Sequence, residues 1–238
     1  LRSIGTQYAQ EWVTRFGFDA EKHPAYLTMA LGAGSVTPMQ MVVGYSTFAN
    51  GGYRVNPWLV SMVTEQRGKV LVESKPPALA DSERAIDARN AFMMSSLLQE
   101  VTRSGTAARA QATLKRPDVY GKTGTTNDSM DAWFAGYNPT LTAVTWIGYD
   151  TPRKLGDRET GGGLSLPVWI SFMETALKGV PVSELSAPEG VIHVGNEWFY
   201  EEYARNSGVS GVGLDENSEP LTVPLPPAEE KSRILDLF

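Results

Sequence analysis

Apolar side chains recur every three or four residues in four stretches of the chain, which is the spacing of helices that bury one face. We predict helices over residues 1–16, 39–50, 87–103 and 166–177. The second follows Thr37 and Pro38, a favourable N-cap and first-turn residue, and stops at a glycine pair. The apolar faces of the last two helices are expected to pack on a sheet, and are formed by Phe92, Met93, Leu97, Leu98 and Val101 and by Val168, Trp169, Phe172, Met173 and Leu177.

Short runs of β-branched and aromatic residues between turn signals predict strands. Residues 55–64 and 69–72 flank a Gln-Arg-Gly turn and are expected to form a hairpin, and residues 188–192 form one more candidate strand. Three further strands are predicted almost back to back, over residues 119–126, 132–137 and 141–149. The Asn-Pro turn between the last two predicts a second hairpin. We therefore expect an α+β fold, an antiparallel sheet with helices packed on its faces.

The strand over 119–126 is unusual because it holds a lysine and two glycines among β-branched residues. A glycine inside a strand often marks the close approach of a ligand or another backbone. Lys122 supplies a positive charge, Thr123 and Thr125 supply hydroxyl donors, and Gly124 leaves room for a substrate backbone. An exposed N–H of Thr125 could also stabilise an oxyanion. We expect this strand to have a neighbour on one side only and to line an open groove.

The Lys-Thr pair has two other interpretations. A phosphate loop needs Gly-x-x-x-x-Gly-Lys-[Ser/Thr] opening a helix, but Arg116 stands where the first glycine belongs and residues 116–120 contain no glycine. That spacing excludes a nucleotide site. A plain edge strand with a solvated lysine stays open as the structural alternative.

Composition narrows the function classes further. The formal net charge is −6 and the basic residues form no long run, so no nucleic-acid footprint is expected. The basic cluster of Arg103, Arg109, Lys115 and Arg116 is interpreted as a solvated face. The two histidines are far apart and there is no cysteine, so we predict no metal site and no cofactor. The sequence has no apolar run of about 18 residues, the length a membrane-spanning helix needs.

Three segments together resemble the transpeptidase domain of class A penicillin-binding proteins. They are Lys-Thr-Gly-Thr-Thr at 122–126, Asp-Ala-Trp-Phe-Ala-Gly-Tyr at 131–137 and Trp-Ile-Gly-Tyr-Asp at 146–150. The family carries Ser-x-x-Lys, Ser-x-Asn and Lys-Thr-Gly motifs. The Thr-Pro helix start with the later Ala-Asn-Gly-Gly, and a Gly-Thr-Ala turn at 105–107, resemble the same family. In that turn, Gly105 as a helix C-cap is a sufficient explanation of the local pattern.

The resemblance implies the serine transpeptidase/β-lactamase-like fold and a peptidoglycan D,D-transpeptidase that works by serine acyl transfer. The implied partners are stem peptides ending in D-Ala–D-Ala and β-lactam antibiotics. The implied place is the periplasmic face of the bacterial inner membrane, with the membrane anchor outside this chain. Lys122 and Thr125 are the implied catalytic residues, and Thr123, Gly124, Thr125 and Thr126 the implied substrate-binding ones.

The family's nucleophile and its Ser-x-Asn serine are not in this sequence. No serine has a lysine three positions later, so the chain by itself is expected to be inactive and to need a missing N-terminal half of the same enzyme. The start at Leu1, without an initiator methionine, also suggests a piece of something longer. Two alternatives stay open: a non-catalytic scaffolding fragment, and a D,D-carboxypeptidase or serine β-lactamase relative.

Composition divides the chain into three expected parts. Residues 1–180 are expected to form the C-terminal half of the transpeptidase domain, and residues 181–206 a C-terminal extension. Residues 207–238 hold glycines, prolines and acidic residues with few apolar anchors, which is typical of a flexible tail.

Overall fold

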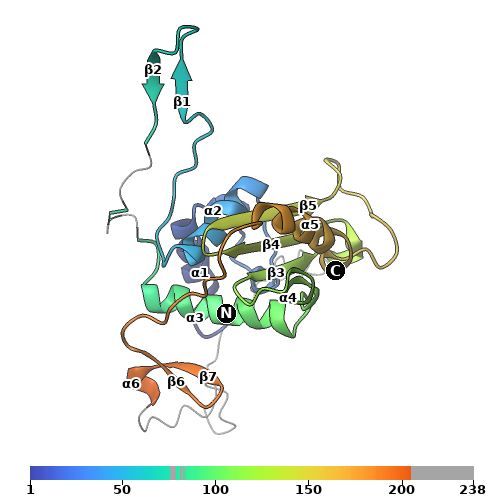
Figure 1. Ribbon diagram of the computed structural model, residues 1–238. Coiled ribbons are helices and arrows are strands. Elements are labelled where there is room, and N and C mark those ends of the chain that lie inside the picture. The colour runs from blue at the N-terminus through green and yellow to red at the C-terminus, as the bar shows by residue number, and fades with distance from the viewer. Residues whose placement is uncertain (76–78, 81, 83, 205–238) are drawn as a thin grey trace, which may run out of the picture.

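The computed structural model of the chain describes residues 1–75, 79–80, 82 and 84–204. A three-stranded antiparallel sheet in the order β3-β4-β5 lies at its centre (Figure 1). The strands are Tyr120–Thr125, Ala132–Asn138 and Leu141–Ile147. These three predicted strands are confirmed to within two residues, and the antiparallel sheet with helices on its faces is confirmed as well. Within the described residues β3 pairs with β4 alone, so the predicted single neighbour of this strand is confirmed as well.

The predicted helices are present with small changes in their bounds. The helices are α1 (Thr6–Val13), α2 (Pro38–Ala49), α3 (Ala88–Arg103), α4 (Arg109–Leu114), α5 (Leu166–Ala176) and α6 (Glu201–Ala204). The first is shorter than residues 1–16, because the chain tightens into a 3₁₀ turn over Thr14–Phe16. At the start of α2, Thr37 and Gln40 form a reciprocal capping box, with Gln40 N donating to Thr37 Oγ1 at 3.2 Å and Thr37 N donating to Gln40 Oε1 at 2.9 Å.

Each face of the sheet carries its own hydrophobic core. On one face Phe134 of β4 packs with Trp169 and Met173 of α5 and with Ala110 of α4, all of them fully or almost fully buried. On the other face Tyr120 and Tyr137 pack with Leu98 of α3 and with aromatic residues of α2. This division follows from the alternation of side chains along a strand, which sends Phe134 and Tyr137 to opposite faces.

Three apolar residues predicted to be buried are exposed instead. Leu97 is 62% exposed, Val168 52% and Phe172 53%. Val168 and Phe172 are four residues apart and share the side of α5 that turns away from the sheet, whereas Trp169 and Met173 share the side that packs on it. Apolar residues covered more than half of this helix, so their spacing alone did not single out the buried side.

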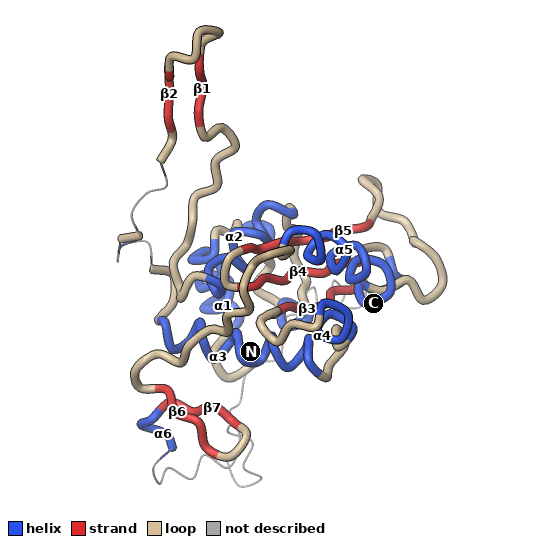
Figure 2. The backbone as a smooth tube through the Cα atoms, in the orientation of Figure 1, coloured by secondary structure: helices blue, strands red, loops and turns tan. Residues whose placement is uncertain are grey.

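A long excursion leaves the body of the protein after α2 and returns before α3. It carries the two-stranded hairpin of β1 (Met62–Thr64) and β2 (Val70–Glu73), which projects away from the other elements (Figure 2). The predicted first strand is shorter than residues 55–64, because only its last three residues pair. At the base of the excursion Gly52 O accepts hydrogen bonds from Ala85 N at 2.8 Å and Ile86 N at 3.2 Å, which holds the two ends together.

A second hairpin follows α5 and docks on α3. It is formed by β6 (Val191–Val194) and β7 (Glu197–Tyr200), which replace the strand predicted over 188–192. Phe92 of α3 meets the Trp198 ring edge-on at 4.9 Å between ring centroids, and Arg89 forms an ion pair with Glu202 at 2.9 Å. The flexible tail predicted over 207–238 lies outside the described residues.

Arg116 and Asp118 form a buried ion pair just before β3. Their side chains are 11% and 0% exposed, and the guanidinium contacts both carboxylate oxygens at 2.9 and 2.7 Å. Arg116 also donates to Val180 O, and Ser183 N donates to Asp118 Oδ2 at 3.0 Å. The interpretation of the basic cluster as a solvated face is therefore wrong for Arg116, which pins the segment after α5 to the start of the edge strand.

We expect Asp118→Ala to lower the free energy of unfolding by about 3–5 kcal/mol, because it leaves a buried guanidinium without its counter-charge. Asp157→Ala is the matched control, since its ion pair with Lys154 is 90% and 55% exposed and its loss should not change the denaturation midpoint. Guanidinium denaturation followed by circular dichroism measures both. Equal midpoints for the Asp118→Ala variant and the wild type would contradict the structural role of the pair.

Three tyrosines lie between the sheet and helices α2 and α3. Tyr120 and Tyr137 stack with their ring centroids 5.1 Å apart, and Tyr45 meets Tyr137 edge-on at 6.4 Å. Burial raises the pKa of Tyr45 to about 12 and also raises the pKa values of Tyr120 and Tyr137. A hydrogen bond with Ser95 at 2.7 Å partly offsets the effect of burial on the pKa of Tyr137. These phenols are therefore neutral in the folded protein at any pH near neutrality.

The raised pKa values predict a loss of stability at alkaline pH. Below about pH 10 the tyrosines are neutral in both states, and above it they ionise in the unfolded chain first. The free energy of unfolding should then fall, by about 1.4 kcal/mol per pH unit for each tyrosine that stays neutral in the folded state, until the pH reaches its folded pKa. Thermal unfolding between pH 9 and 12 measures this decline. Tyr45→Phe should flatten it and the exposed Tyr8→Phe should not; identical slopes in the two variants would contradict the assignment.

Candidate functional site

The edge strand β3 carries the site predicted from the sequence. Thr126 N donates to Asp131 O at 3.1 Å, toward β4, so the N–H groups of Thr123 and Thr125 point the other way, to the open edge. The backbone of these two threonines is thus unpaired within the described sheet. The N–H proposed for an oxyanion from the sequence points to the side from which a ligand would approach.

Lys122 leaves the strand from the face opposite to the two threonines, as neighbouring residues of a strand do. Its side chain is exposed, and its Nζ donates to Thr123 O at 2.9 Å. Because the carbonyl of Thr123 lies on the open edge, the ammonium group reaches that edge too. The lysine charge thus lies at the open edge, while the two threonine hydroxyls leave the strand on the opposite face, toward Thr106 and Gly161.

The hydroxyl of Thr125 faces a glycine-rich turn, Gly161–Ser165, that precedes α5. Gly161 N donates to Thr125 Oγ1 at 3.0 Å, which leaves the hydroxyl proton of Thr125 free to donate. A Cβ at Gly161 would lie 2.2 Å from Trp133 O and 2.5 Å from Gly124 O. The turn can lie this close to the strand only because residue 161 has no side chain.

Gly124 and Thr126 have different surroundings. A Cβ at Gly124 would meet the Cβ of Trp133 at 3.2 Å, so glycine keeps this part of the strand close to its partner. Thr126 closes the connection to β4, because its Oγ1 accepts a hydrogen bond from Asp131 N at 2.7 Å. The structure thus gives Thr126 a part in the turn, and its contact with substrate stays a prediction.

The structure adds Thr106 to the residues found from the sequence. Its Oγ1 lies 2.9 Å from Thr123 Oγ1, although the two residues come from different segments. The Gly-Thr-Ala turn was noted in the sequence, but the capping role of Gly105 explained it sufficiently, so its threonine was not assigned to the site. Helix α3 in fact ends at Arg103 with Ser104 as its C-cap, so the prediction of Gly105 as the cap is wrong. A short, unpredicted helix, α4, begins at Arg109, and Thr106 lies in the connection between the two helices, where it reaches the strand.

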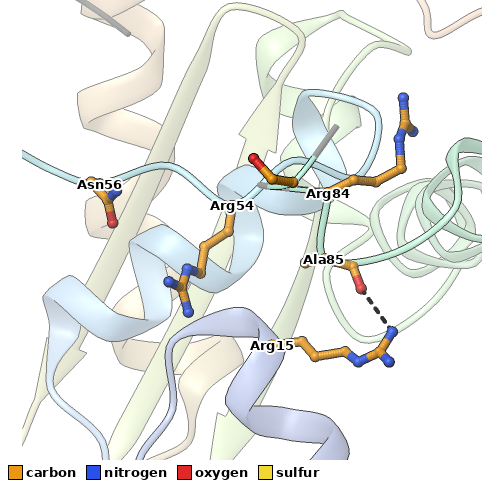
Figure 3. Close-up of a pocket in the computed structure, with 6 residues that line it drawn as sticks. Arg15, Arg54, Asn56, Arg84 and Ala85 are labelled. Atoms are coloured by element: carbon orange, nitrogen blue, oxygen red, sulfur yellow. Dashed lines mark hydrogen bonds between the residues drawn. The ribbon is translucent and has the colours of Figure 1, made fainter. Parts of the chain in front are cut away.

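The hollow drawn in Figure 3 lies away from β3, between the first helical segment and the base of the hairpin excursion. It measures about 240 Å³ and its lining includes Arg15, Arg54 and Arg84. Arg15 donates to Ala85 O at 3.4 Å, and Arg84 donates to Gly51 O at 3.2 Å. The figure shows the guanidinium groups of Arg54 and Arg84 turned away from each other, so the three charges do not converge on one ligand.

Comparison with known proteins assigns the chain to a family. The model of the penicillin binding protein transpeptidase domain matches residues 2–173. The chain belongs to the penicillin-binding protein transpeptidase domain family. The resemblance seen in the Lys-Thr-Gly and Trp-Phe-Ala-Gly-Tyr segments is thereby confirmed.

Individual relatives agree with the family model. The chain is 44% identical over 216 residues to penicillin-binding protein 1A of Neisseria flavescens, covering 90% of this chain and 27% of that protein. It is 37% identical to penicillin-binding protein 1A of Pseudomonas aeruginosa, covering 81% of this chain and 29% of that protein. The chain therefore spans about a quarter of the length of the curated relatives it matches.

Solved structures confirm the predicted fold class. The crystal structure of penicillin-binding protein 1A from Haemophilus influenzae superposes with a TM-score of 0.75 at 32% identity, covering 80% of this chain and 34% of that one. PonA1 from Mycobacterium tuberculosis superposes with a TM-score of 0.62 at 23% identity, covering 79% of this chain and 53% of that one, which shows the shared fold. Within the described residues no helix has the length and apolar character to cross a membrane.

We expect Gly161→Ala to disturb the contact between the turn and β3, because the added methyl group meets backbone atoms of both strands. The cost should be about 1–3 kcal/mol of the free energy of unfolding, which is typical of overpacking. Gly163→Ala is the matched control in the same turn, since its nearest neighbour is the side-chain oxygen of Thr160 at 3.3 Å. Denaturation midpoints of the two variants measure the difference in stability. A Gly161→Ala variant as stable as Gly163→Ala would contradict the close packing of the turn against β3.

Proposed function

We propose that this chain forms one wall of the active site of a peptidoglycan D,D-transpeptidase, a serine acyl-transfer enzyme that also binds β-lactams. The observation that carries the proposal is the open edge of β3, which has an ammonium group and two outward N–H groups, with two threonine hydroxyls on the adjoining face. Membership of the transpeptidase family supports the same reaction.

The cluster suits the two negative charges of this reaction. A serine Oγ attacks the carbonyl carbon of the D-Ala–D-Ala bond, the C–N bond breaks, and D-alanine leaves with a proton on its nitrogen. An amine of a neighbouring stem peptide then displaces the serine. In this proposal Lys122, Thr123 and Thr125 hold the substrate's terminal carboxylate by charge-assisted hydrogen bonds. The N–H of Thr125 stabilises the oxyanion of the tetrahedral intermediate.

The serine nucleophile comes from outside these 238 residues in the proposal, because the sequence contains no Ser-x-x-Lys. The outer edge of β5 supports a place for the rest of the domain. The ladder with β4 uses the backbone groups of alternate residues, so those of Thr142, Val144 and Trp146 point outward and have no strand partner in the described sheet. This strand has no charged residue or proline, the features that normally protect a free edge. We infer that strands of the missing N-terminal half pair with it.

The names of the relatives and the family model both support a penicillin-binding, cell-wall transpeptidase. We further propose D-Ala–D-Ala stem peptides as the substrate, the periplasmic face of the inner membrane as the place of action, and a membrane anchor outside these 238 residues.

Lys122→Ala should slow acylation of the full-length enzyme by a β-lactam by tens to hundreds of fold, because it removes a charged partner of the carboxylate worth about 1.5–3 kcal/mol. Thr123→Val and Thr125→Val should also slow it. The N–H of Thr125 survives the last substitution, so the oxyanion contact remains. Second-order labelling rates with a fluorescent penicillin measure the effects.

Two exposed residues on the α5 side provide matched controls for this experiment. Lys178→Ala and Thr175→Val remove the same groups far from the strand edge and should label at the wild-type rate. Wild-type rates in all three β3 variants would refute the carboxylate site and favour a scaffolding role for the strand.

A further inference from the structure

Thr106 and Thr123 form a hydroxyl pair at the back of the proposed carboxylate site. Their Oγ1 atoms are 2.9 Å apart, and either can be the donor. No other hydrogen bond of Thr106 Oγ1 is formed within the described part of the chain. A hydroxyl carries one proton, so the direction of this bond decides whether Thr123 keeps its own proton for a ligand.

The backbone on either side of Thr106 is fixed. Gly105 N donates to Glu100 O at 3.1 Å and Ala107 N donates to Val101 O at 3.1 Å, so the turn is tied to the last turn of α3. A Cβ at Gly105 would lie 2.9 Å from Val101 Cα, and Ala107 is completely buried in the core shared with α5. The turn therefore holds Thr106 rigidly against β3 before any ligand binds.

The Gly161–Ser165 turn closes the other side of the pair. A Cβ at Gly162 would lie 3.4 Å from Thr106 O and 3.8 Å from Thr123 Cγ2. Three segments thus meet at the hydroxyl pair, namely the turn after α3, the edge strand, and the turn before α5, while Thr106 itself stays exposed to solvent. With Thr106 as donor, the proton of Thr123 is free to point to the open edge.

We propose that Thr106 is a positioning residue for carboxylate recognition: it donates its proton to Thr123 Oγ1 and so commits the Thr123 hydroxyl to donate to the substrate. The inference rests on the proposed function, because the carboxylate at β3 belongs to the same substrate. Thr106 lies outside the Lys-Thr-Gly strand, and in this role it does not touch substrate yet sets the direction of a substrate hydrogen bond.

The test compares two inhibitors on the full-length enzyme: benzylpenicillin, which has the carboxylate, and its methyl ester, which lacks the negative charge. Thr106→Val keeps the shape of the side chain and removes the donor. It should slow acylation by benzylpenicillin about 3- to 10-fold, the effect of one ordinary hydrogen bond, and leave the ester rate unchanged. Thr106→Ser should restore the wild-type rate within about twofold.

A double-mutant cycle separates positioning from general disturbance. In a Thr123→Val background, Thr106→Val should cause no further loss, since the hydroxyl it orients is gone. Equal losses for both inhibitors, or additive losses in the cycle, would overturn the inference. The ratio of the benzylpenicillin rate to the ester rate does not depend on the folded fraction, so it tests the positioning role even in a variant that folds poorly. Thr106→Ala is a second variant without the hydroxyl and should give the same change in this ratio.

Failure of the positioning role of Thr106 can be distinguished from failure of the proposed function. If Lys122→Ala and Thr123→Val slow acylation while Thr106→Val does not, only the positioning role is wrong. If none of the three variants slows it, the carboxylate site itself is refuted. Thr175→Val, an exposed threonine on α5, is the matched control for loss of a hydroxyl.

Discussion

The one-sided pairing of β3 is the constraint on which the site depends. An edge strand offers a row of unpaired backbone groups, and proteins usually blunt such an edge or cover it. Here the edge strand carries the ammonium group of Lys122 and the hydroxyls of Thr123 and Thr125, and the N–H groups of the two threonines face outward. A strand paired on that side would form hydrogen bonds with these N–H groups, which the proposed reaction needs as free donors. The helices therefore support β3 from its faces and leave its edge open.

Tight packing behind the strand keeps this edge in place. The ring of Phe134 meets Trp169 of α5 at 4.8 Å between centroids, and Trp169 Nε1 donates to Ala143 O at 3.0 Å. The rings lie against glycines of the strands, since a Cβ at Gly121 would be 2.7 Å from the Phe134 ring and one at Gly136 would be 2.9 Å from that of Trp169. The same absence of side chains lets the Gly161 turn approach Thr125. Glycine at these positions therefore follows from close packing.

The parts of the fold that local pattern controls could be predicted from the sequence. Thr37 and Pro38 identified the start of α2, and the Asn-Pro turn identified the β4–β5 hairpin, because capping and turn chemistry act over a few residues. The predicted site strand was located for the same reason: lysine and glycine are unusual in a β-branched run. Its open edge was also predicted, from the glycines that flank the lysine.

The parts that depend on distant contacts could not be predicted. Arg116 was expected to be solvated, since nothing near it in sequence shows that Val180 O lies against its guanidinium. Thr106 was passed over because its partner is 17 residues away and the helix end explained the local pattern. Apolar residues on both sides of α5 likewise concealed that Val168 and Phe172 are exposed. In each case the deciding contact is tertiary.

A crystal structure of the full-length enzyme acylated by a β-lactam tests most directly whether β3 is one wall of an acyl-transfer site whose nucleophile lies outside this chain. The account predicts a serine ester outside residues 1–238, with the drug's carboxylate within hydrogen-bonding distance of Thr123 Oγ1 and Thr125 Oγ1 and the ester carbonyl oxygen at Thr125 N. An adduct on a residue of this chain, or a carboxylate held away from β3, would contradict it.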